Sequence, residues 1–281
     1  MKAASLKIIH AVHPDDFKKY TTEQIRENFL LSDLEKDDSI ELGYTHYDRL
    51  IAGLAKPVTK SLTLTGYDNL KSKYFLERRE LGIINVGGEG TVSVDGKSFS
   101  VAKEDCVYAG KGSKEVIFSS KDQKNPAVFY LLSTPAHQTF PTVLMKSAEA
   151  TRFELGSSAT CNERTLARYI HEGGIQSCQL VMGVTTIKAG SAWNSVPPHT
   201  HDRRSELYFY FDLKPEFRVF HFMGEPQETR HIVMKNFEVV ASPSWSVHFG
   251  CGTSNYTFIW GMGGENKEFD DMDAAPVTEL L

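Results

Sequence analysis

The chain has 281 residues, of which 41% are hydrophobic and 24% are charged, and 31 basic against 36 acidic residues give it a net charge of −5. These are ordinary values for a globular protein, and they exclude a mostly disordered chain and a coiled coil. Because no segment is strongly basic and no apolar run approaches the roughly 18 residues of a membrane span, we expect neither a nucleic acid nor a membrane as partner.

The first residues and the cysteines bear on where the protein works. The apolar run over residues 6–9 is too short for the core of a secretory signal. The four cysteines are far apart and form no Cys-x-x-Cys pair, which is too sparse for a disulfide-stabilised fold. We therefore predict a reduced, cytoplasmic protein.

The predicted elements are mostly short strands. A helix is predicted over residues 22–31, where Thr21 or Thr22 can cap the first turn. Alternating residues on both sides of Asp95-Gly96 predict a hairpin over residues 91–101. Further strands are predicted at 207–211, 218–223, 231–234, 238–241 and 256–260, and a short helical tail segment is predicted after Pro276. This pattern is typical of a mainly β protein, such as a sandwich, a barrel or a jelly roll.

A weak internal repeat relates the two halves of the chain. Arg78-Arg79 precedes Glu80 at the start of an apolar segment, and Arg203-Arg204 precedes Glu206 in a similar way. Such a repeat, in a chain about twice the usual domain length of roughly 150 residues, predicts two similar β domains. We place them at residues 1–150 and 151–281.

The second half carries a set of metal-ligating residue types. His199 and His201 are two apart, so on a strand both imidazoles point to one face. Glu206 has the wrong parity for an unbroken strand, but a turn in the polar run between them lets it point back at the histidines. With His248, after a turn at Pro243, the set suits Zn²⁺, Fe²⁺, Mn²⁺ or Ni²⁺ and leaves positions open for substrate oxygens.

A His-x-His pair alone is often only a polar surface. Here it is followed by a four-residue spacer, Glu206 and a distant His248, and that combination is the signature of the cupin superfamily. Aligning Glu80 with Glu206 places a lysine and a phenylalanine at the histidine positions of the first half, so we predict that the first domain lacks the ligands. Arg79 and Glu80 are then expected to be ion-paired surface or interface groups.

Several long blocks resemble the 5-keto-4-deoxyuronate isomerase family. They cover residues 74–82, 224–234, 242–246, 256–262 and 269–273, and the resemblance extends from about residue 20 to the C-terminus. It implies two cupin-type jelly-roll barrels with a few short helices, a hexamer, and one Zn²⁺ per subunit in the second barrel. The family's zinc ligands correspond to His199, His201, Glu206 and His248, all of which are present.

The resemblance also implies a reaction. It is the conversion of 5-dehydro-4-deoxy-D-glucuronate to 3-deoxy-D-glycero-2,5-hexodiulosonate in pectin breakdown, by metal-assisted proton transfer between C1 and C2. A divalent cation bound to both oxygens would stabilise the enediolate. Tyr208 and Tyr210 share a strand face with Glu206 and can donate to a substrate oxygen, or pack only as core aromatics; Glu206 itself can move the proton.

The substrate carboxylate calls for a cation, ideally a bidentate guanidinium. Arg203 and Arg204 adjoin the metal ligands in sequence, and Arg230 precedes a predicted strand, so these three are the candidates for binding the carboxylate. The alternative is that each is only a solvated surface charge. Arg164 and Arg168 are further candidates. His221 and His231, on predicted strands, are expected to be satisfied structural histidines.

Two other functions fit the same motif. A metal-dependent cupin dioxygenase would use the same ligands with Fe²⁺ or Ni²⁺ and consume oxygen. A non-catalytic sugar-binding cupin would bind the uronate without converting it, although no appended DNA-binding helices or basic arm are present.

Overall fold

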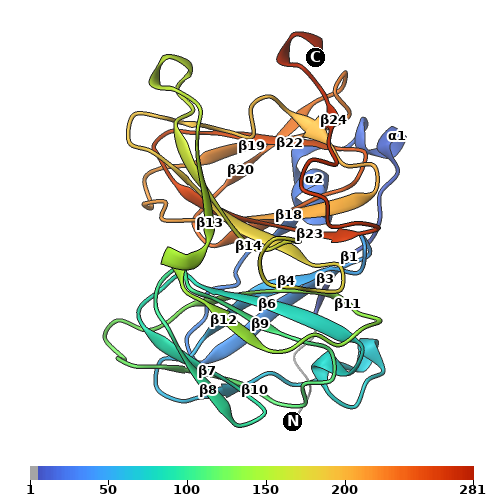
Figure 1. Cartoon of the computed structure of the whole chain (residues 1–281). Coiled ribbons are helices and arrows are strands. Elements are labelled where there is room, and N and C mark those ends of the chain that lie inside the picture. The colour runs from blue at the N-terminus through green and yellow to red at the C-terminus, as the bar shows by residue number, and fades with distance from the viewer. Residues whose placement is uncertain (1–5) are drawn as a thin grey trace.

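The computed structural model describes residues 6–281, which form four stacked layers of β-sheet (Figure 1). The helices are short: α1 (Pro14–Phe17), α2 (Thr22–Phe29) and the 3₁₀ turns Asp68–Leu70, Phe75–Glu77, Ser147–Glu149, Ser158–Thr160 and Val277–Glu279. The prediction of a mainly β chain with a few short helices is confirmed. No helix in the described residues is long and apolar enough to cross a membrane.

The first half contributes a seven-stranded and a four-stranded sheet. In spatial order the larger sheet is β1 (Lys7–Ile9), β3 (Ser39–Thr45), β4 (Ile51–Lys56), β11 (Phe129–Pro135), β6 (Arg79–Asn85), β9 (Cys106–Ala109) and β12 (Val143–Met145). The smaller sheet is β5 (Leu62–Thr63), β10 (Val116–Ser120), β7 (Gly90–Val94) and β8 (Lys97–Val101).

The second half repeats this arrangement. Its larger sheet is β13 (Thr151–Leu155), β14 (Arg164–Ile170), β15 (Val181–Ile187), β23 (Thr257–Gly264), β18 (Arg204–Phe211), β21 (Glu238–Ser242) and β2 (Leu30–Leu31). Its smaller sheet is β16 (Trp193–Asn194), β22 (Val247–Gly252), β19 (Val219–Gly224) and β20 (Arg230–Met234). A separate two-stranded ribbon joins β17 (His199–Thr200) to β24 (Asp273–Ala274).

The same spatial order in both halves is what the weak sequence repeat predicted. The order β4-β11-β6-β9 in the first sheet matches β15-β23-β18-β21 in the second, and each small sheet follows a matching order. One strand departs from this plan, because β2 comes from the start of the chain and pairs with β21 of the second half. The domain boundary at residue 150, and the closure of each half into a barrel, stay predictions.

The two seven-stranded sheets pack against each other at the centre of the molecule (Figure 1). Tyr130 and Phe209 stack across this contact with ring centroids 4.5 Å apart. Glycines permit the close approach, because a Cβ atom on Gly82 would lie 2.6 Å from the sulfur of Met182, and one on Gly261 would lie 2.0 Å from a methyl carbon of Leu132. This central contact supports the sheet that carries Glu206.

The local predictions largely hold. Helix α2 begins after Thr21, whose side chain forms a capping box with Gln24, but it ends at Phe29 because residues 30–31 form β2. Asp95 and Gly96 both have positive φ, as the turn between β7 and β8 requires. The strands predicted in the second half correspond to β18, β19, β20, β21 and β23, and the tail after Pro276 forms a 3₁₀ turn.

The alignment of Glu80 with Glu206 is wrong by one residue. Leu81 pairs with Ala109 in the first half where Glu206 pairs with Ser242 in the second, so Leu81 occupies the structural position of Glu206. Because neighbouring residues of a strand face opposite ways, Glu80 points instead toward the other half. It is fully buried rather than on the surface.

Glu80 joins the two halves of the chain through hydrogen bonds. Its carboxylate accepts from Tyr108 Oη at 2.6 Å and Thr134 Oγ1 at 3.0 Å, and from the backbone N–H groups of residues 178–180 at 2.7–2.8 Å. Arg79 is buried as well and donates to Ser133 and to the carbonyl of Arg49. Glu80 is thus an interface group held by neutral donors, with no ion pair to Arg79 among the described residues.

Candidate metal centre

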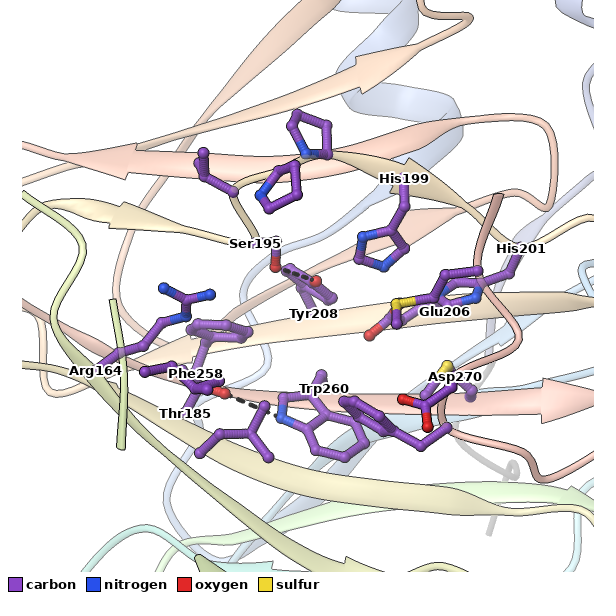
Figure 2. A pocket seen from close by; sticks show the side chains of 18 of the residues that line it. Arg164, Thr185, Ser195, His199, His201, Glu206, Tyr208, Phe258, Trp260 and Asp270 are labelled. Carbon is purple, nitrogen blue, oxygen red and sulfur yellow. Dashed lines mark hydrogen bonds and ion pairs between the residues drawn. The ribbon is translucent and has the colours of Figure 1, made fainter. Parts of the chain in front are cut away.

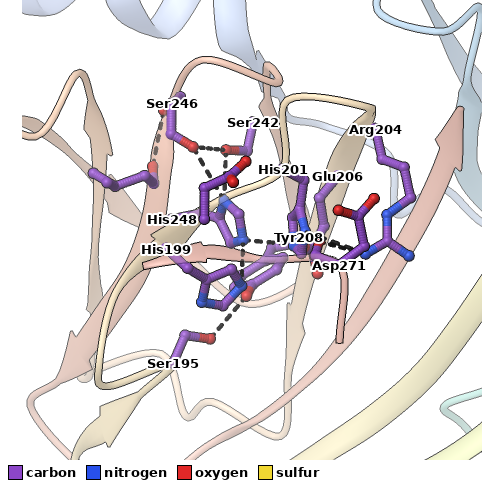
Figure 3. Close-up of polar contacts among 12 residues, drawn as sticks. Ser195, His199, His201, Arg204, Glu206, Tyr208, Ser242, Ser246, His248 and Asp271 are labelled. Atoms are coloured by element: carbon purple, nitrogen blue, oxygen red, sulfur yellow. Dashed lines mark hydrogen bonds and ion pairs between the residues drawn. The ribbon is translucent and has the colours of Figure 1, made fainter. Parts of the chain in front are cut away.

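Three imidazoles and one carboxylate converge in the second half of the chain. His199, His201, Glu206 and His248 each offer one ligand atom, and these atoms all lie within 4.8 Å of one another (Figure 3). Glu206 Oε2 is 2.9 Å from His248 Nε2 and 3.2 Å from His201 Nε2, and the Nε2 atoms of His199 and His248 are 3.1 Å apart. The four residues that the sequence singled out are therefore brought together.

The fold places these side chains from three separate elements. His199 lies in β17, and His201 follows it after one residue, so both rings turn the same way. A tight turn at residues 202–203 leads into β18, whose third residue is Glu206. His248 comes from β22, in the smaller sheet that covers β18. The predicted reversal of the chain between His201 and Glu206 is present, two residues shorter than expected.

The hydrogen bonds of the outer ring nitrogens fix which way the inner nitrogens face. His201 Nδ1 is 2.8 Å from the carbonyl oxygen of Asp271, which can only accept, so we assign the proton to Nδ1. Arg204 Nη2, 3.2 Å from this nitrogen, donates to the same carbonyl at 3.0 Å. His248 Nδ1 lies 3.2 Å from the carbonyl oxygen of Ser246. In a neutral imidazole with a protonated Nδ1, Nε2 carries a lone pair, and here these lone pairs point at Glu206.

This donor set fits a divalent cation. Glu206 Oε2 is buried and has no hydrogen bond of acceptable geometry, although two imidazole nitrogens lie within 3.2 Å. Lone pairs of nitrogen and oxygen that face one another at such distances repel unless a positive charge lies between them. Imidazole nitrogen with carboxylate oxygen, and no thiolate, is a set that Zn²⁺, Fe²⁺, Mn²⁺ and Ni²⁺ accept.

The protonation of the cluster supports the same reading. Burial raises the pKa of Glu206, but the nearness of His248 and His201 more than offsets this, and the net pKa lies below its ordinary value. Burial, with His248 and His201 nearby, lowers the pKa of His199 to about 3. At neutral pH Glu206 is an anion and His199 is neutral, which are the protonation states of metal ligands.

A cavity of about 460 Å³ opens beside the cluster (Figure 2). His199, His201 and Glu206 line it on one side, while Phe258 and Trp260 form an apolar floor. The volume is within the range of small-molecule sites. Because three of the four candidate ligands face this cavity, an ion bound to them would be accessible to a small molecule in the cavity.

The two candidate tyrosines differ in their access to the cavity. Tyr208 lines it, and its hydroxyl is 2.8 Å from that of Ser195. Tyr210 does not line it; its hydroxyl is 2.8 Å from Nδ1 of His221 behind the cluster. Burial raises the pKa of both tyrosines well above the ordinary value, so both stay protonated at neutral pH.

The two histidines expected to be structural lie outside the cluster. His221 is fully buried in β19, and its Nε2 has no hydrogen-bond partner within residues 6–281, so it is only half satisfied. Burial lowers the pKa of His221 to about 3, which keeps the ring neutral. His231 is exposed on β20.

The three arginines predicted to hold a substrate carboxylate have other contacts. Arg203 pairs with Asp271 and Asp273, and the fully buried Arg204 donates to the carbonyl of Asp271 at 3.0 Å. Arg230 pairs with Glu228 at 2.6 Å. None of the three lines the cavity described above. Their role as carboxylate ligands stays a prediction, which this placement does not support, because closeness in sequence to a metal ligand does not decide which way a side chain points.

A C-terminal segment that the sequence reasoning did not assign covers one side of the cluster. Its residues 269–274 pass over the ligands, and Ala274 pairs with His199 across the β17–β24 ribbon. The side chain of Asp271 is fixed by Arg203 and Asn266. Its backbone carbonyl accepts the hydrogen bond from His201 Nδ1 (Figure 3). The acidic pair Asp270-Asp271 could have pointed to this segment, because it lies in one of the blocks that resemble the family, but the sequence assigned it no role. We name residues 265–281 the C-terminal strap.

Comparison with known proteins gives a family and several relatives. The model of the KduI/IolB family matches residues 38–277. Proteins from Lachnoclostridium phytofermentans (53% identical, 96% of this chain and 98% of the relative) and Formosa agariphila (54%, 96% and 97%) are both named 4-deoxy-L-threo-5-hexosulose-uronate ketol-isomerase. A third with this name, from Shouchella clausii, is 53% identical over 98% of this chain and 100% of the relative.

Solved structures show the same fold at low sequence identity. An IolB-like protein from Salmonella typhimurium has a TM-score of 0.69 at 15% identity, covering 86% of this chain and 94% of its own. Oxalate decarboxylase from Bacillus subtilis has a TM-score of 0.55 at 11% identity, covering 78% and 69%. The cupin-type fold predicted from the motif is thereby confirmed.

The strap makes a prediction about metal affinity. Arg203→Ala removes the ion pairs that fix Asp271, so the carbonyl that orients His201 is released, and we expect affinity for Zn²⁺ to fall by about 10-fold or more. Competition with a chromogenic chelator measures this affinity. Arg78→Ala, the counterpart of Arg203 in the sequence repeat, is the control and should bind Zn²⁺ as the parent does. Equal affinity in Arg203→Ala and the parent would contradict the orienting role.

Proposed function

The chain belongs to the KduI/IolB family, and from this premise we propose that it is a ketol-isomerase of 4-deoxy-L-threo-5-hexosulose uronate, also called 5-dehydro-4-deoxy-D-glucuronate. The product would be 3-deoxy-D-glycero-2,5-hexodiulosonate, in the breakdown of pectin-derived uronates. The observation that carries the proposal is the intact set of three imidazoles and one carboxylate beside a cavity that three of them line, in a chain 53–54% identical to relatives with that name.

We propose that His199, His201, Glu206 and His248 hold one Zn²⁺ per subunit. When bound, this ion would supply Lewis acidity for the substrate oxygens on C1 and C2. The protein's own contribution is orientation, because the carbonyls of Asp271 and Ser246 hold two of the imidazoles with Nε2 facing inward. Glu206, buried and anionic, balances the charge of the ion.

The isomerisation itself needs a proton to leave C2 and a proton to arrive at C1. Tyr208 is suited to hydrogen bonding rather than to proton abstraction, because its raised pKa keeps its hydroxyl protonated at neutral pH. We propose that it donates to a substrate oxygen from the cavity wall, with Ser195 fixing the hydroxyl at 2.8 Å. We propose that Glu206 shuttles the proton when it is released from its role as a ligand, since it faces the cavity and is ionised.

The assembly and location follow the family expectation. We propose a homo-hexamer acting in the cytoplasm. Strand β13 supports self-association, because all five of its residues are exposed and it forms an edge of its sheet.

The test of the proposed function is turnover with and without metal. The uronate, prepared by lyase cleavage of an oligouronate, is incubated with the protein in the absence of oxygen. We expect isomerisation without oxygen, a loss of about 100-fold or more after chelation, because Lewis-acid stabilisation is worth several kcal/mol, and recovery on adding Zn²⁺. Oxygen-dependent turnover would identify a dioxygenase, and binding without conversion a sugar-binding protein.

Histidine variants make that test specific to the cluster. His248→Ala should remain folded and lose activity along with its bound metal. His231→Ala, at an exposed position of β20 in the same sheet, should retain both. A folded His248→Ala protein that isomerises at the parental rate would contradict the proposed metal role.

The tyrosine pair gives a separate prediction. Tyr208→Phe removes a hydroxyl that faces the cavity, and we expect kcat to fall by about 10- to 100-fold, as for a lost hydrogen-bond donor to a developing charge. Tyr210→Phe removes one that bonds His221 instead, so it should lower the melting temperature with kcat within about threefold of the parent. Steady-state kinetics with thermal melts separates the two, and a larger kcat loss in Tyr210→Phe would reverse the assignment.

A further inference from the structure

The wall of the cavity opposite the metal cluster carries two arginines on one strand. Arg164, Leu166 and Arg168 alternate along β14, and all three side chains line the cavity. Three strand intervals separate β14 from β18, the strand of Glu206, which places the two strand axes about 14 Å apart. In Figure 2, Arg164 lies at one end of the cavity and His201 and Glu206 at the other, with Tyr208 and Phe258 between them.

Arg164 is a cation with no counter-ion in this wall. Within residues 6–281 its guanidinium makes one hydrogen bond, from Nη1 to the carbonyl of Asn162 at 2.9 Å, and no ion pair. The ionisable groups that act on its pKa are the hydroxyls of Tyr208 and Tyr256, which are neutral at pH 7 because burial raises the pKa of both. Burial lowers the pKa of Arg164, as expected for a charge held away from water without an anion, yet the group stays protonated at neutral pH.

Arg168 is placed differently. Its guanidinium carbon lies 4.5 Å from the ring centre of Phe153 and 3.6 Å from that of Phe269, so it is held between two aromatic faces. Asp270, which also lines the cavity, is its nearby anion. Because Arg168 already stacks on aromatic rings and faces a carboxylate, an anionic ligand would stabilise it less than it would stabilise Arg164.

We propose that Arg164 binds the C6 carboxylate of the uronate, at the end of the cavity opposite the metal cluster. This inference rests on the proposed function. The substrate has its reacting oxygens on C1 and C2 and its negative charge at the other end of a six-carbon chain. The cavity matches this arrangement, with the metal cluster at one end and the Arg164 guanidinium at the other. A guanidinium with free N–H groups suits a carboxylate because it can donate two parallel hydrogen bonds. The apolar floor of Phe258 and Trp260 suits the deoxygenated carbon between the two ends.

The test compares Arg164→Met, Arg164→Lys, Arg168→Met and the control Arg152→Met. Arg152 lies on β13 with its side chain on Ser147, outside the cavity lining. Calorimetry measures binding of the uronate and of its counterpart with a hydroxymethyl group at C6, and kinetics gives KM and kcat. Elemental analysis and thermal melts confirm that each variant keeps its metal and its fold.

We expect the parent to bind the uronate more tightly than the neutral counterpart. In Arg164→Met, KM and the dissociation constant for the uronate should rise about 10- to 100-fold with kcat within about threefold, and the preference over the neutral counterpart should be lost. Arg164→Lys should recover part of the affinity, and Arg152→Met should match the parent.

Two outcomes would overturn the inference, and they are distinguishable. If the parent isomerises the uronate but Arg164→Met keeps the parental affinity and preference, or Arg168→Met alone loses them, the carboxylate assignment is wrong while the proposed function stands. If the parent neither binds nor converts the uronate, the proposed function fails and the assignment fails with it.

Discussion

The site depends on one buried carboxylate that faces three imidazoles. Glu206 is 4% exposed, and its Oε2 atom meets imidazole nitrogens at 2.9 and 3.2 Å whose lone pairs point toward it. Removing a carboxylate from water costs several kcal/mol, and this arrangement offers it no donated proton in return. A divalent ion would resolve the conflict, because it would neutralise the carboxylate and share the lone pairs of all four ligand atoms. The hydrogen bonds of His201 and His248 to backbone carbonyls would then support the metal site, since they fix the rings in the required tautomer.

The two halves of the chain share a fold, but only the second half carries the candidate metal ligands. They share one strand order, and the position of Glu206 is filled by Leu81 in the first half. The neighbouring Glu80 faces the opposite way, into the central contact, where it accepts hydrogen bonds from the backbone of residues 178–180. Strand parity therefore decides the different directions of the two glutamates, since Glu206 faces the metal cluster and Glu80 links the halves. The first half can serve as the support that holds the second large sheet in place.

Much of this was predictable from the sequence, for local reasons. The spacing of His199, His201, Glu206 and His248 predicted the cluster because strand alternation and a turn are short-range properties, and Asp95-Gly96 predicted its hairpin for the same reason. What the sequence did not predict depended on long-range contacts. Residues 30–31 form a strand because β21 offers an open edge, although their sequence continues a helix. Arg203 and Arg204 face the C-terminal strap, which lies about 70 residues further along the chain. The one-residue error at Glu80 arose because a similar Arg-Arg pair can precede strands that differ in parity.

The central claim is that the active protein holds one divalent ion on these four side chains. Elemental analysis combined with X-ray absorption at the metal edge of catalytically active protein tests it most directly. The account predicts about one ion per chain, with a first coordination shell of imidazole nitrogen and carboxylate oxygen at about 2.0–2.2 Å and no sulfur. Fully active protein with far less than one ion per chain, or a shell containing sulfur, would contradict it.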